Sequence, residues 1–356
     1  MTYPRLIIRR SSFASNAEVL CRRCAASGLS VTGVTKGFCG EPRLVQHMVE
    51  AGVLSLADSC LQNIVMLRKA GFALPLYMLR IPMISELDEL IQWADGSLIS
   101  GCETIEALER ACASSKRTHE ALLMFELGDL REGFWPWELE RVAESLKRSP
   151  HVIPIGVGTN FGCYGATVPT PQKLLFLGEI GKELARLTGR EIKLCSGGST
   201  SSLKLMTEGT LPLCVNNLRV GEGIVLGADV VRNESIPWLR QDVMTAEAEI
   251  VEVRVKPSVP IGETSLTAFG ERPFFPERGE RLHAIAALGR QSAKYDDLTP
   301  VDEGVEILGA SSDHLILDVD AMPRAPRVGS ILRFRPGYGA MLRLFTSPYV
   351  EKIFEN

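Results

Sequence analysis

The stretch LSVTGVTK at residues 29–36 is an apolar run that ends in a single lysine, and glycines follow at positions 37 and 40. Small and β-branched residues without helical spacing, followed by turn glycines, predict a buried strand and a tight turn. In a parallel barrel the carboxyl ends of the strands carry the chemistry, so Lys36 would stand where a ligand binds. Its amine could form a Schiff base with an aldehyde. The alternative is a strand-end lysine that only reaches solvent.

Seven more apolar runs follow, and helical patterns separate them. With 29–35, the strand candidates are 53–57, 75–80, 96–100, 120–126, 152–159, 191–196 and 217–220. Helical spacing, with proline near several first turns, occurs at 13–25, 42–51, 61–69, 85–93, 104–114, 136–147 and 171–187. Strands of this kind are typical of parallel sheets that are covered on both faces. Eight strand–helix units therefore predict an α/β fold with a (β/α)8 barrel of the TIM type.

The pattern changes after about residue 235. The segment 246–253 alternates in the manner of a half-buried strand, and the further strand candidates are 283–288, 305–309, 314–319 and 331–335. Helical periodicity is not evident there. We therefore predict a barrel domain over residues 9–234 and an all-β domain over residues 235–356. Residues 6–8 also have strand character, so the segment 1–8 is expected to join the β domain.

Composition excludes several classes of protein. The chain has 356 residues, of which 45% are hydrophobic and 23% charged, as expected for a soluble protein with room for two cores. A net charge of -4 gives no basic face for nucleic acid. No apolar run is long enough to span a membrane, and the first residues lack the pattern of a secretory signal. Nine scattered cysteines fit a reducing compartment, so a cytoplasmic location without a zinc site is expected.

Two glycine-rich loops follow late strand candidates. SGGSTSS occupies residues 196–202, and RVGEG occupies residues 219–223. Glycines let backbone N–H groups approach an anion, and the hydroxyls of Ser199 and Thr200 can donate to it. Barrel enzymes commonly hold phosphate on the loops after their last strands. We therefore predict a phosphate site, although each loop alone would also fit a plain turn.

Short motifs along nearly the whole chain carry a family resemblance. They are TK (35–36) with CG (39–40), LADS (56–59), LRIPMISE (79–86), LGDLREG (127–133), GTN (158–160) with CYG (163–165), SGG (196–198), NNLR (216–219), GASSDH (309–314) and TSPYVEK (346–352). Together they resemble the fold-type III pyridoxal-phosphate enzymes, the group of alanine racemase and eukaryotic-type ornithine decarboxylase. Within this group the chain resembles the ornithine racemases.

The resemblance implies a cofactor and the residues that hold it. Pyridoxal 5'-phosphate would be attached covalently to Lys36, and Arg131 would contact its phenolic oxygen and lie near the substrate carboxylate. Asn160 falls where alanine racemase has a histidine against the cofactor ring. The implied phosphate contacts are Ser199, Thr200, Gly221, the backbone amide of Glu222, and Tyr338 from the β domain.

Arg219 bears on the type of reaction. It matches the arginine that meets the pyridine nitrogen in alanine racemase, where the decarboxylases have a glutamate. A guanidinium stays protonated and can only donate, so the ring nitrogen would remain unprotonated and the cofactor would be a weaker electron sink. This favours return of a proton over decarboxylation. The predicted activity is interconversion of L- and D-ornithine, or of related basic amino acids, by two-base transfer of the α-proton.

A racemase needs a second proton carrier opposite the lysine. The place that holds a tyrosine in alanine racemase corresponds to Gly289 and Arg290, and arginine is a poor base. The decarboxylases bring a comparable segment from a partner subunit, which aligns here with residues 311–314. Ser312 or His314 would then carry the proton, with His314 favoured because an imidazole can both accept and return a proton, and Asp313 would pair with a distal amine of the substrate.

The family also implies a homodimer in which each β domain completes the partner's active site. Two other functions remain open from the sequence. One is a pyridoxal-phosphate-dependent decarboxylase of basic amino acids, against which Arg219 argues. The other is a non-catalytic protein of pyridoxal-phosphate homeostasis, whose known representatives generally lack a β domain.

Overall fold

The computed structural model describes residues 2–356 and divides them into two compact units. One unit is Arg10–Val243, and the other combines the residues up to Arg9 with Met244–Asn356. The division therefore falls after Val243, where the sequence pattern placed it after residue 234. The intervening segment stays with the first unit because the Asn16 side chain accepts from the backbone N–H of Arg240 at 2.7 Å and donates to its carbonyl at 2.8 Å.

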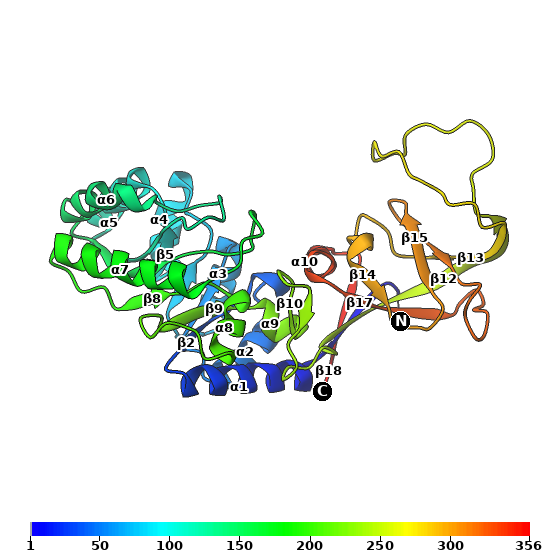
Figure 1. The fold of residues 1–356 in the computed structure, drawn as a ribbon, viewed down its shortest axis with the longest axis horizontal. Coiled ribbons are helices and arrows are strands. Elements are labelled where there is room, and N and C mark those ends of the chain that lie inside the picture. Colours follow the sequence, from blue (N-terminus) through cyan, green and yellow to red (C-terminus); the bar gives the residue numbers. More distant parts are fainter. Residues whose placement is uncertain (1) are drawn as a thin grey trace. The chain divides into compact units, whose positions relative to one another are not determined.

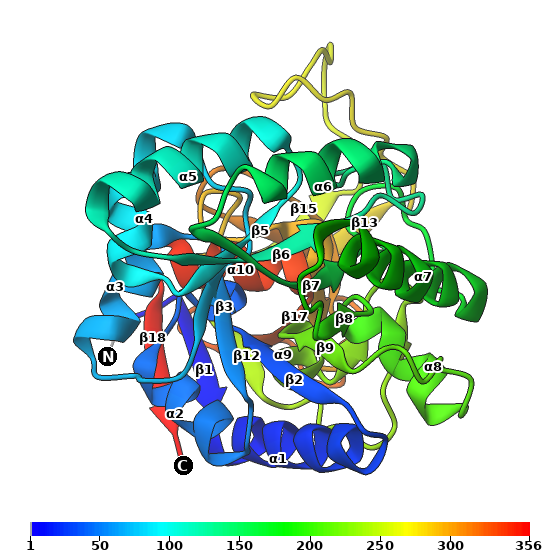
Figure 2. The same cartoon turned by 90° about the vertical axis from the view of Figure 1, so that its left-hand side faces the viewer.

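The unit Arg10–Val243 is built around a closed barrel of parallel strands (Figure 2). Its strands are β2 (Ser30–Val34), β3 (Ser55–Asp58), β4 (Leu76–Met78), β5 (Gly96–Ile99), β6 (His119–Met124), β7 (Val152–Gly158), β8 (Leu194–Ser196) and β9 (Asn217–Val220). Each overlaps one of the eight predicted strands. The barrel closes where β2 pairs with β9, with Ser30 opposite Asn217.

Helices cover the outside of the barrel (Figures 1 and 2). They are α1 (Arg10–Ala26), α2 (Pro42–Glu50), α3 (Leu61–Lys69), α4 (Leu87–Trp93), α5 (Cys102–Ser115), α6 (Leu139–Lys147), α7 (Pro171–Thr188), α8 (Leu203–Thr207) and α9 (Glu222–Leu226), with short 3₁₀ turns at η1 (Lys36–Phe38), η2 (Ile84–Glu86), η3 (Pro136–Glu138) and η4 (Thr200–Ser202). Leu98, Leu122 and Met124 form a buried cluster on neighbouring strands. This filled core leaves the loops at the strand ends as the place for chemistry.

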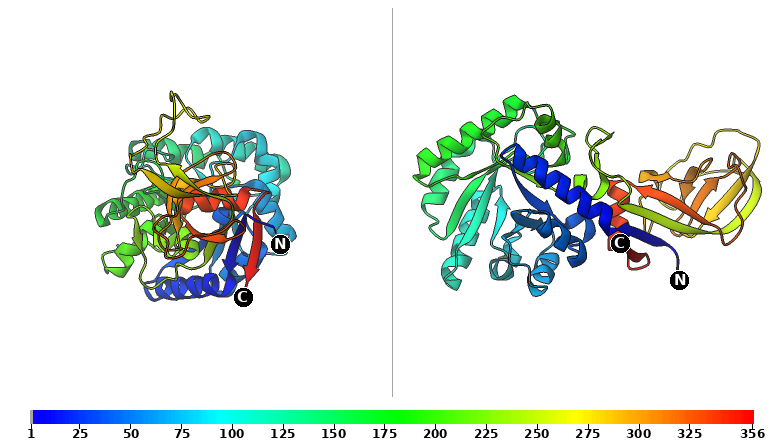
Figure 3. Two further views of the ribbon diagram at one scale, coloured as in Figure 1. Left: turned by 90° about the vertical axis from the view of Figure 1, so that its right-hand side faces the viewer. Right: turned by 90° about the horizontal axis from the view of Figure 1, so that it is seen from below.

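The second unit is a mostly antiparallel sheet. Its strands are β1 (Arg5–Arg9), β12 (Met244–Pro257), β13 (Glu280–Ala286), β14 (Leu298–Pro300), β15 (Glu306–Ala310), β16 (Leu315–Asp318), β17 (Ile331–Pro336) and β18 (Glu351–Glu355). β12 pairs along its length with β1, β17 and β13 (Figure 3). β1 also pairs with β18 in parallel, so the amino-terminal strand lies inside this sheet. The predicted fold class, a TIM-type barrel followed by a β domain, is confirmed.

The expectation that helices end with the barrel was wrong. Helix α10 (Tyr338–Thr346) forms in the β unit and buries Ala340, Met341 and Leu344, which lie on one helical face. The helix is short, and a glycine pair at its start gave the segment the character of a turn. Two small strands of the barrel unit, β10 (Ala228–Asp229) and β11 (Glu234–Ser235), and one 3₁₀ turn of the β unit, η5 (Tyr295–Asp297), complete the fold. Within residues 2–356, no helix has both the length and the apolar character needed to cross a membrane.

Candidate active site

Lys36 opens the turn η1 directly after strand β2, at the carboxyl end of the barrel. The residue before it, Thr35, is buried, and its hydroxyl donates to the Asp58 carboxylate at 2.5 Å. Asp58 ends β3 and also accepts from the backbone N–H of Cys60 at 2.9 Å. The backbone that carries Lys36 is therefore tied to the neighbouring strand by a buried carboxylate. No role for Asp58 was predicted from the sequence.

Arg219 lies inside the barrel mouth on β9, with 5% of its surface exposed. Its guanidinium donates to Ser196 Oγ at 2.6 Å, to the Thr159 carbonyl at 2.7 Å and to Asn160 Oδ1 at 2.9 Å. Burial lowers the pKa of Arg219 to about 10, so the group is still a cation at neutral pH. Arg219 is thus a fixed donor whose orientation is set by strands β7 and β8.

Arg131 lies in the loop after β6, where backbone bonds to a buried carboxylate set the conformation. Glu126 accepts from the backbone N–H groups of Gly128 and Arg131. The guanidinium of Arg131 bonds both carboxylate oxygens of Glu132, and Glu132 Oε1 also accepts from Asn160 Nδ2 at 3.0 Å. Arg131, Asn160 and Arg219, which the sequence predicted separately, are thereby joined in one network. Glu132, which links them, was not predicted.

The two predicted phosphate loops are joined by a hydrogen bond. Thr200 Oγ1 accepts from the backbone N–H of Gly223 at 3.0 Å. Gly221 is required by its surroundings, because a Cβ there would lie 2.6 Å from the carbonyl oxygen of Val34. Gly198 adopts φ +104°, a conformation that favours glycine. Ser199, Thr200, Gly221 and Glu222 therefore lie on adjoining loops beside the end of strand β2.

The Glu222 side chain has an unusual environment. Its Oε1 accepts from the backbone N–H of Val230 at 2.9 Å. Burial raises the pKa of Glu222 to about 7, with a further contribution from Asp229, while the charge of Lys36 acts in the opposite direction. The Lys36 amine is therefore close enough to influence this carboxyl group electrostatically.

The shifted pKa of Glu222 predicts a pH dependence of stability. A folded-state pKa raised from 4.5 to about 7 stabilises the fold at low pH, and this contribution is lost as the pH rises through that window. Glu222→Gln cannot ionise, so its unfolding free energy should not fall in this way. The difference between the unfolding free energies of Glu222→Gln and wild type should therefore increase by about 2 kcal/mol, in favour of the variant, from pH 5 to pH 8. Urea denaturation of the cofactor-free protein at both pH values measures this. An equal difference at both would contradict it.

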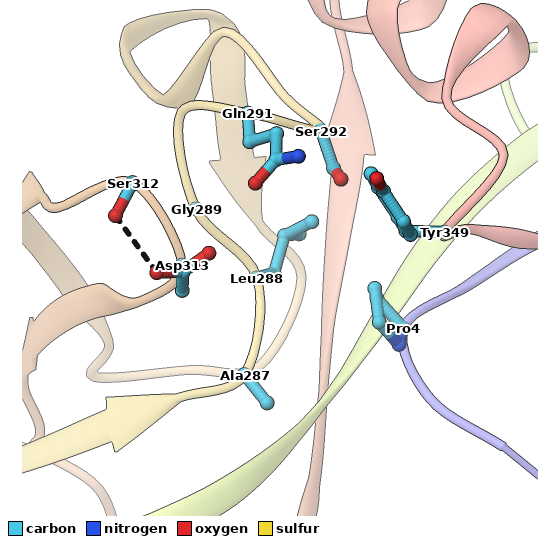
Figure 4. A pocket seen from close by; sticks show the side chains of 9 residues that line it. All are labelled: Pro4, Ala287, Leu288, Gly289, Gln291, Ser292, Ser312, Asp313 and Tyr349. Atoms are coloured by element: carbon cyan, nitrogen blue, oxygen red, sulfur yellow. Dashed lines mark hydrogen bonds between the residues drawn. The ribbon is translucent and has the colours of Figure 1, made fainter.

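In the β unit, the predicted residues Ser312, Asp313 and His314 are exposed in the turn between β15 and β16. Ser312 Oγ donates to Asp313 at 2.8 Å, and both residues line a cavity of about 330 Å³ (Figure 4). The other lining residues are Pro4, Ala287, Leu288, Gly289, Gln291, Ser292 and Tyr349. His314 is not among them. Of the two residues considered for the second proton carrier, Ser312 lines this cavity and His314 does not.

The two segments considered for the second proton carrier lie side by side. The backbone N–H of Arg290 donates to the Ser311 carbonyl at 2.9 Å, and a Cβ on Gly289 would lie 2.3 Å from the Ser312 carbonyl oxygen. The Arg290 guanidinium donates to both carboxylate oxygens of Glu271 and to the Ala310 carbonyl. Arg290 therefore acts as a structural cation that supports the turn.

The remaining predicted residue, Tyr338, is the first residue of α10 and is partly buried. The Asp297 carboxylate accepts from the backbone N–H of Ala340 at 2.9 Å and holds the start of this helix. Its contact with phosphate stays a prediction. In the described part of the chain, no group of three or more His, Cys, Asp or Glu side chains could hold a metal ion.

The family is shown by comparison with known proteins. Residues 8–229 match the family model described as "Alanine racemase, N-terminal domain". The chain therefore belongs to the alanine racemase family.

Two curated relatives match over their full lengths. The lysine racemase of Thermotoga maritima is 39% identical over 355 residues, which cover 100% of this chain and 99% of that protein. The ornithine racemase of Acetoanaerobium sticklandii is 38% identical over 353 residues, which cover 98% and 99%. Among solved structures, alanine racemase from Streptomyces lavendulae has a TM-score of 0.75 at 16% identity and covers 100% of this chain and 98% of its own. D-threonine aldolase from Filomicrobium marinum has a TM-score of 0.74 at 17% identity, with 97% and 89% coverage.

Proposed function

We propose that this protein is a pyridoxal-phosphate-dependent racemase of basic amino acids, with ornithine as the substrate. The observation that carries the proposal is the placement of Lys36, Arg131 and Arg219 at one end of the barrel in a chain that matches two basic amino-acid racemases over its full length. Lysine is the second candidate, because the lysine racemase is as similar to the chain as the ornithine racemase is.

The residues at the barrel mouth fit the cofactor. The loops of Ser199, Thr200, Gly221 and Glu222 offer backbone N–H groups and hydroxyls for the phosphate. The buried Thr159 hydroxyl, next to the carbonyl that Arg219 bonds, has no partner among residues 2–356. An open donor at this place is expected of a site that receives a polar ligand. Once bound, the cofactor supplies the electron sink that makes the substrate's α-hydrogen acidic.

The protein's own residues would divide the remaining work. Lys36 would move the α-proton on one face of the substrate, and Arg131 would hold the substrate carboxylate with the N–H groups that its bonds to Glu132 leave open. Arg219 would donate a hydrogen bond to the ring nitrogen and, because it stays a cation at neutral pH, would leave that nitrogen unprotonated. Ser312 or His314, brought by the β domain of a second copy of the chain, moves the proton on the opposite face.

Asp313 is the proposed specificity residue for the substrate's distal ammonium. It lines the β-unit cavity, and its one described side-chain hydrogen bond, from Ser312, leaves further lone pairs free to accept. A carboxylate there would offset the cost of transferring the ammonium out of water.

Substitution of Asp313 tests this role. We expect Asp313→Ala to lower kcat/KM for ornithine by about 10- to 100-fold, because an ion pair is lost, and to change the rate with alanine much less. Asp296→Ala, at an exposed aspartate outside the cavity, is the matched control. Equal losses with both substrates would remove Asp313 from substrate recognition.

The function itself is tested by incubating the holoenzyme separately with L- and D-ornithine and with L- and D-lysine, followed by chiral chromatography. Racemisation predicts that both enantiomers of one amino acid approach the same equal mixture. Release of carbon dioxide without the opposite enantiomer would indicate a decarboxylase. Absence of any conversion would favour a non-catalytic cofactor-binding protein, which the presence of the β unit argues against.

A further inference from the structure

Glu132 is an acidic side chain placed among the cationic groups of the barrel mouth. Arg131 Nε bonds its Oε2, and Arg131 Nη2 bonds its Oε1. Oε1 also accepts from Asn160 Nδ2 at 3.0 Å, while Asn160 Oδ1 accepts from Arg219 at 2.9 Å. The Glu132 side chain is 20% exposed. The Glu132 carboxylate therefore bonds Arg131 directly and is linked to Arg219 through the side-chain amide of Asn160.

The orientation of the Asn160 amide depends on this carboxylate. Its nitrogen faces an acceptor, Glu132, and its oxygen faces a donor, Arg219. With the amide reversed, its NH₂ group would point at the Arg219 guanidinium, which is also only a donor. Glu132 therefore holds the nitrogen end of the Asn160 amide and Arg219 holds its oxygen end, in the one arrangement that gives both ends a partner.

The fold of the loop does not rely on Glu132. Glu126 bonds the backbone N–H groups of Gly128 and Arg131, and Asp129 bonds those of Cys163 and Tyr164. Both of these carboxylates are buried. The hydrogen bonds described for the Glu132 carboxylate all come from side chains, those of Arg131 and Asn160. Glu126 and Asp129 therefore hold the backbone of the loop, whereas Glu132 holds the side chains of Arg131 and Asn160.

Charge supports the same role. Burial acts to lower the pKa of Arg131, but the hydrogen bonds to Glu132, together with electrostatic contributions from Cys163, Glu132 and Asp129, bring the pKa above its ordinary value. Glu132 also favours the cationic form of Arg219, which Arg131 disfavours. Without Glu132, the two arginines and Lys36 would concentrate positive charge at the mouth, and Arg131 would be free to reorient.

We propose that Glu132 is a positioning residue that sets the guanidinium of Arg131 and, through Asn160, that of Arg219 for the cofactor and the substrate carboxylate. It does not itself touch the reacting atoms. The inference rests on the function proposed above, since those two arginines must act on the cofactor and substrate for their placement to matter.

The test uses Glu132→Gln, which keeps the size of the side chain and an acceptor for Asn160 but loses the charge. We expect kcat/KM for the basic amino acid to fall about 10- to 100-fold, because a small displacement of a group that binds the substrate lowers the rate by this much. The melting temperature should stay within about 2 °C of wild type. Glu140→Gln, at an exposed residue of α6, is the matched control. Unchanged kinetics in Glu132→Gln would overturn the proposal.

A double-mutant cycle separates positioning from a merely structural effect. In an Arg131→Lys background the fork to Glu132 is already lost, so Glu132→Gln should then cost far less than in wild type. An equal cost in both backgrounds would overturn the proposal.

Titration of the cofactor-free protein with pyridoxal phosphate, followed by absorbance, gives a second readout that needs no turnover. Glu132→Gln should bind more weakly than the Glu140→Gln control, and equal affinity would overturn the proposal. Failure of the proposed function would instead appear in the wild type, as absence of racemisation.

Discussion

Lys36→Ala will lose racemisation of basic amino acids by about 10⁴-fold or more, because it removes both the covalent anchor of the cofactor and one of the two proton carriers. The chain offers a matched control in Lys182→Ala, an exposed lysine of α7. Chiral chromatography after incubation with either enantiomer measures the loss, and thermal melting shows that both variants are folded. A Lys36→Ala variant with more than about a tenth of wild-type activity would contradict the role, given the size of acid–base contributions.

Hydrogen exchange at the α-carbon assigns the two faces. In deuterated water, Lys36→Ala and a variant of the opposite carrier, Ser312→Ala or His314→Ala, should each exchange the α-hydrogen from one enantiomer only. Mass spectrometry of the recovered amino acid follows the exchange. If Lys36→Ala and both variants of the opposite carrier exchange both enantiomers at the wild-type rate, the two-base scheme is wrong.

Arg219→Lys is expected to lower kcat by about 10²- to 10³-fold, the usual cost of removing an oriented donor from an active site. The lysine keeps the charge, but a single ammonium cannot replace three bonds to Ser196, Thr159 and Asn160 made from one planar group. Arg190→Lys is the control, since Arg190 bonds the Val152 carbonyl at the opposite end of β7. Steady-state kinetics with each enantiomer measure the effect.

A loss of similar size in the Arg190→Lys control would show that the Arg219 effect comes from damage to the barrel. Wild-type rates in Arg219→Lys would show that the arginine does not act on the cofactor ring. Thermal melting of both variants distinguishes these outcomes from general unfolding.

The barrel could be predicted from the sequence because each strand is a short apolar run with turn residues at its ends. Strand β9, for example, has the predicted bounds Asn217–Val220. The small elements were harder to predict. Helix α10 and strand β18 are short and depend on packing in the β unit, and the boundary after Val243 depends on hydrogen bonds from Asn16, which is distant in sequence.

The site was predictable where a residue type is itself informative, as with Lys36 at a strand end and the glycines of the phosphate loops. Glu132 could not be found in this way. An acidic residue beside an arginine in a loop resembles any solvated surface pair, and its role depends on Asn160, which lies in the loop after strand β7. The closeness of Gly289 to Ser312 likewise arises from backbone contacts between distant segments, which no local pattern encodes.

The most direct test of this account is to treat the holoenzyme with borohydride, which makes a link between an amine and an aldehyde permanent, and then to digest it and sequence the labelled peptide by mass spectrometry. The account predicts that the pyridoxyl group is found on Lys36. A label on another lysine, or cofactor that is released intact while Lys36 stays unmodified, would contradict it.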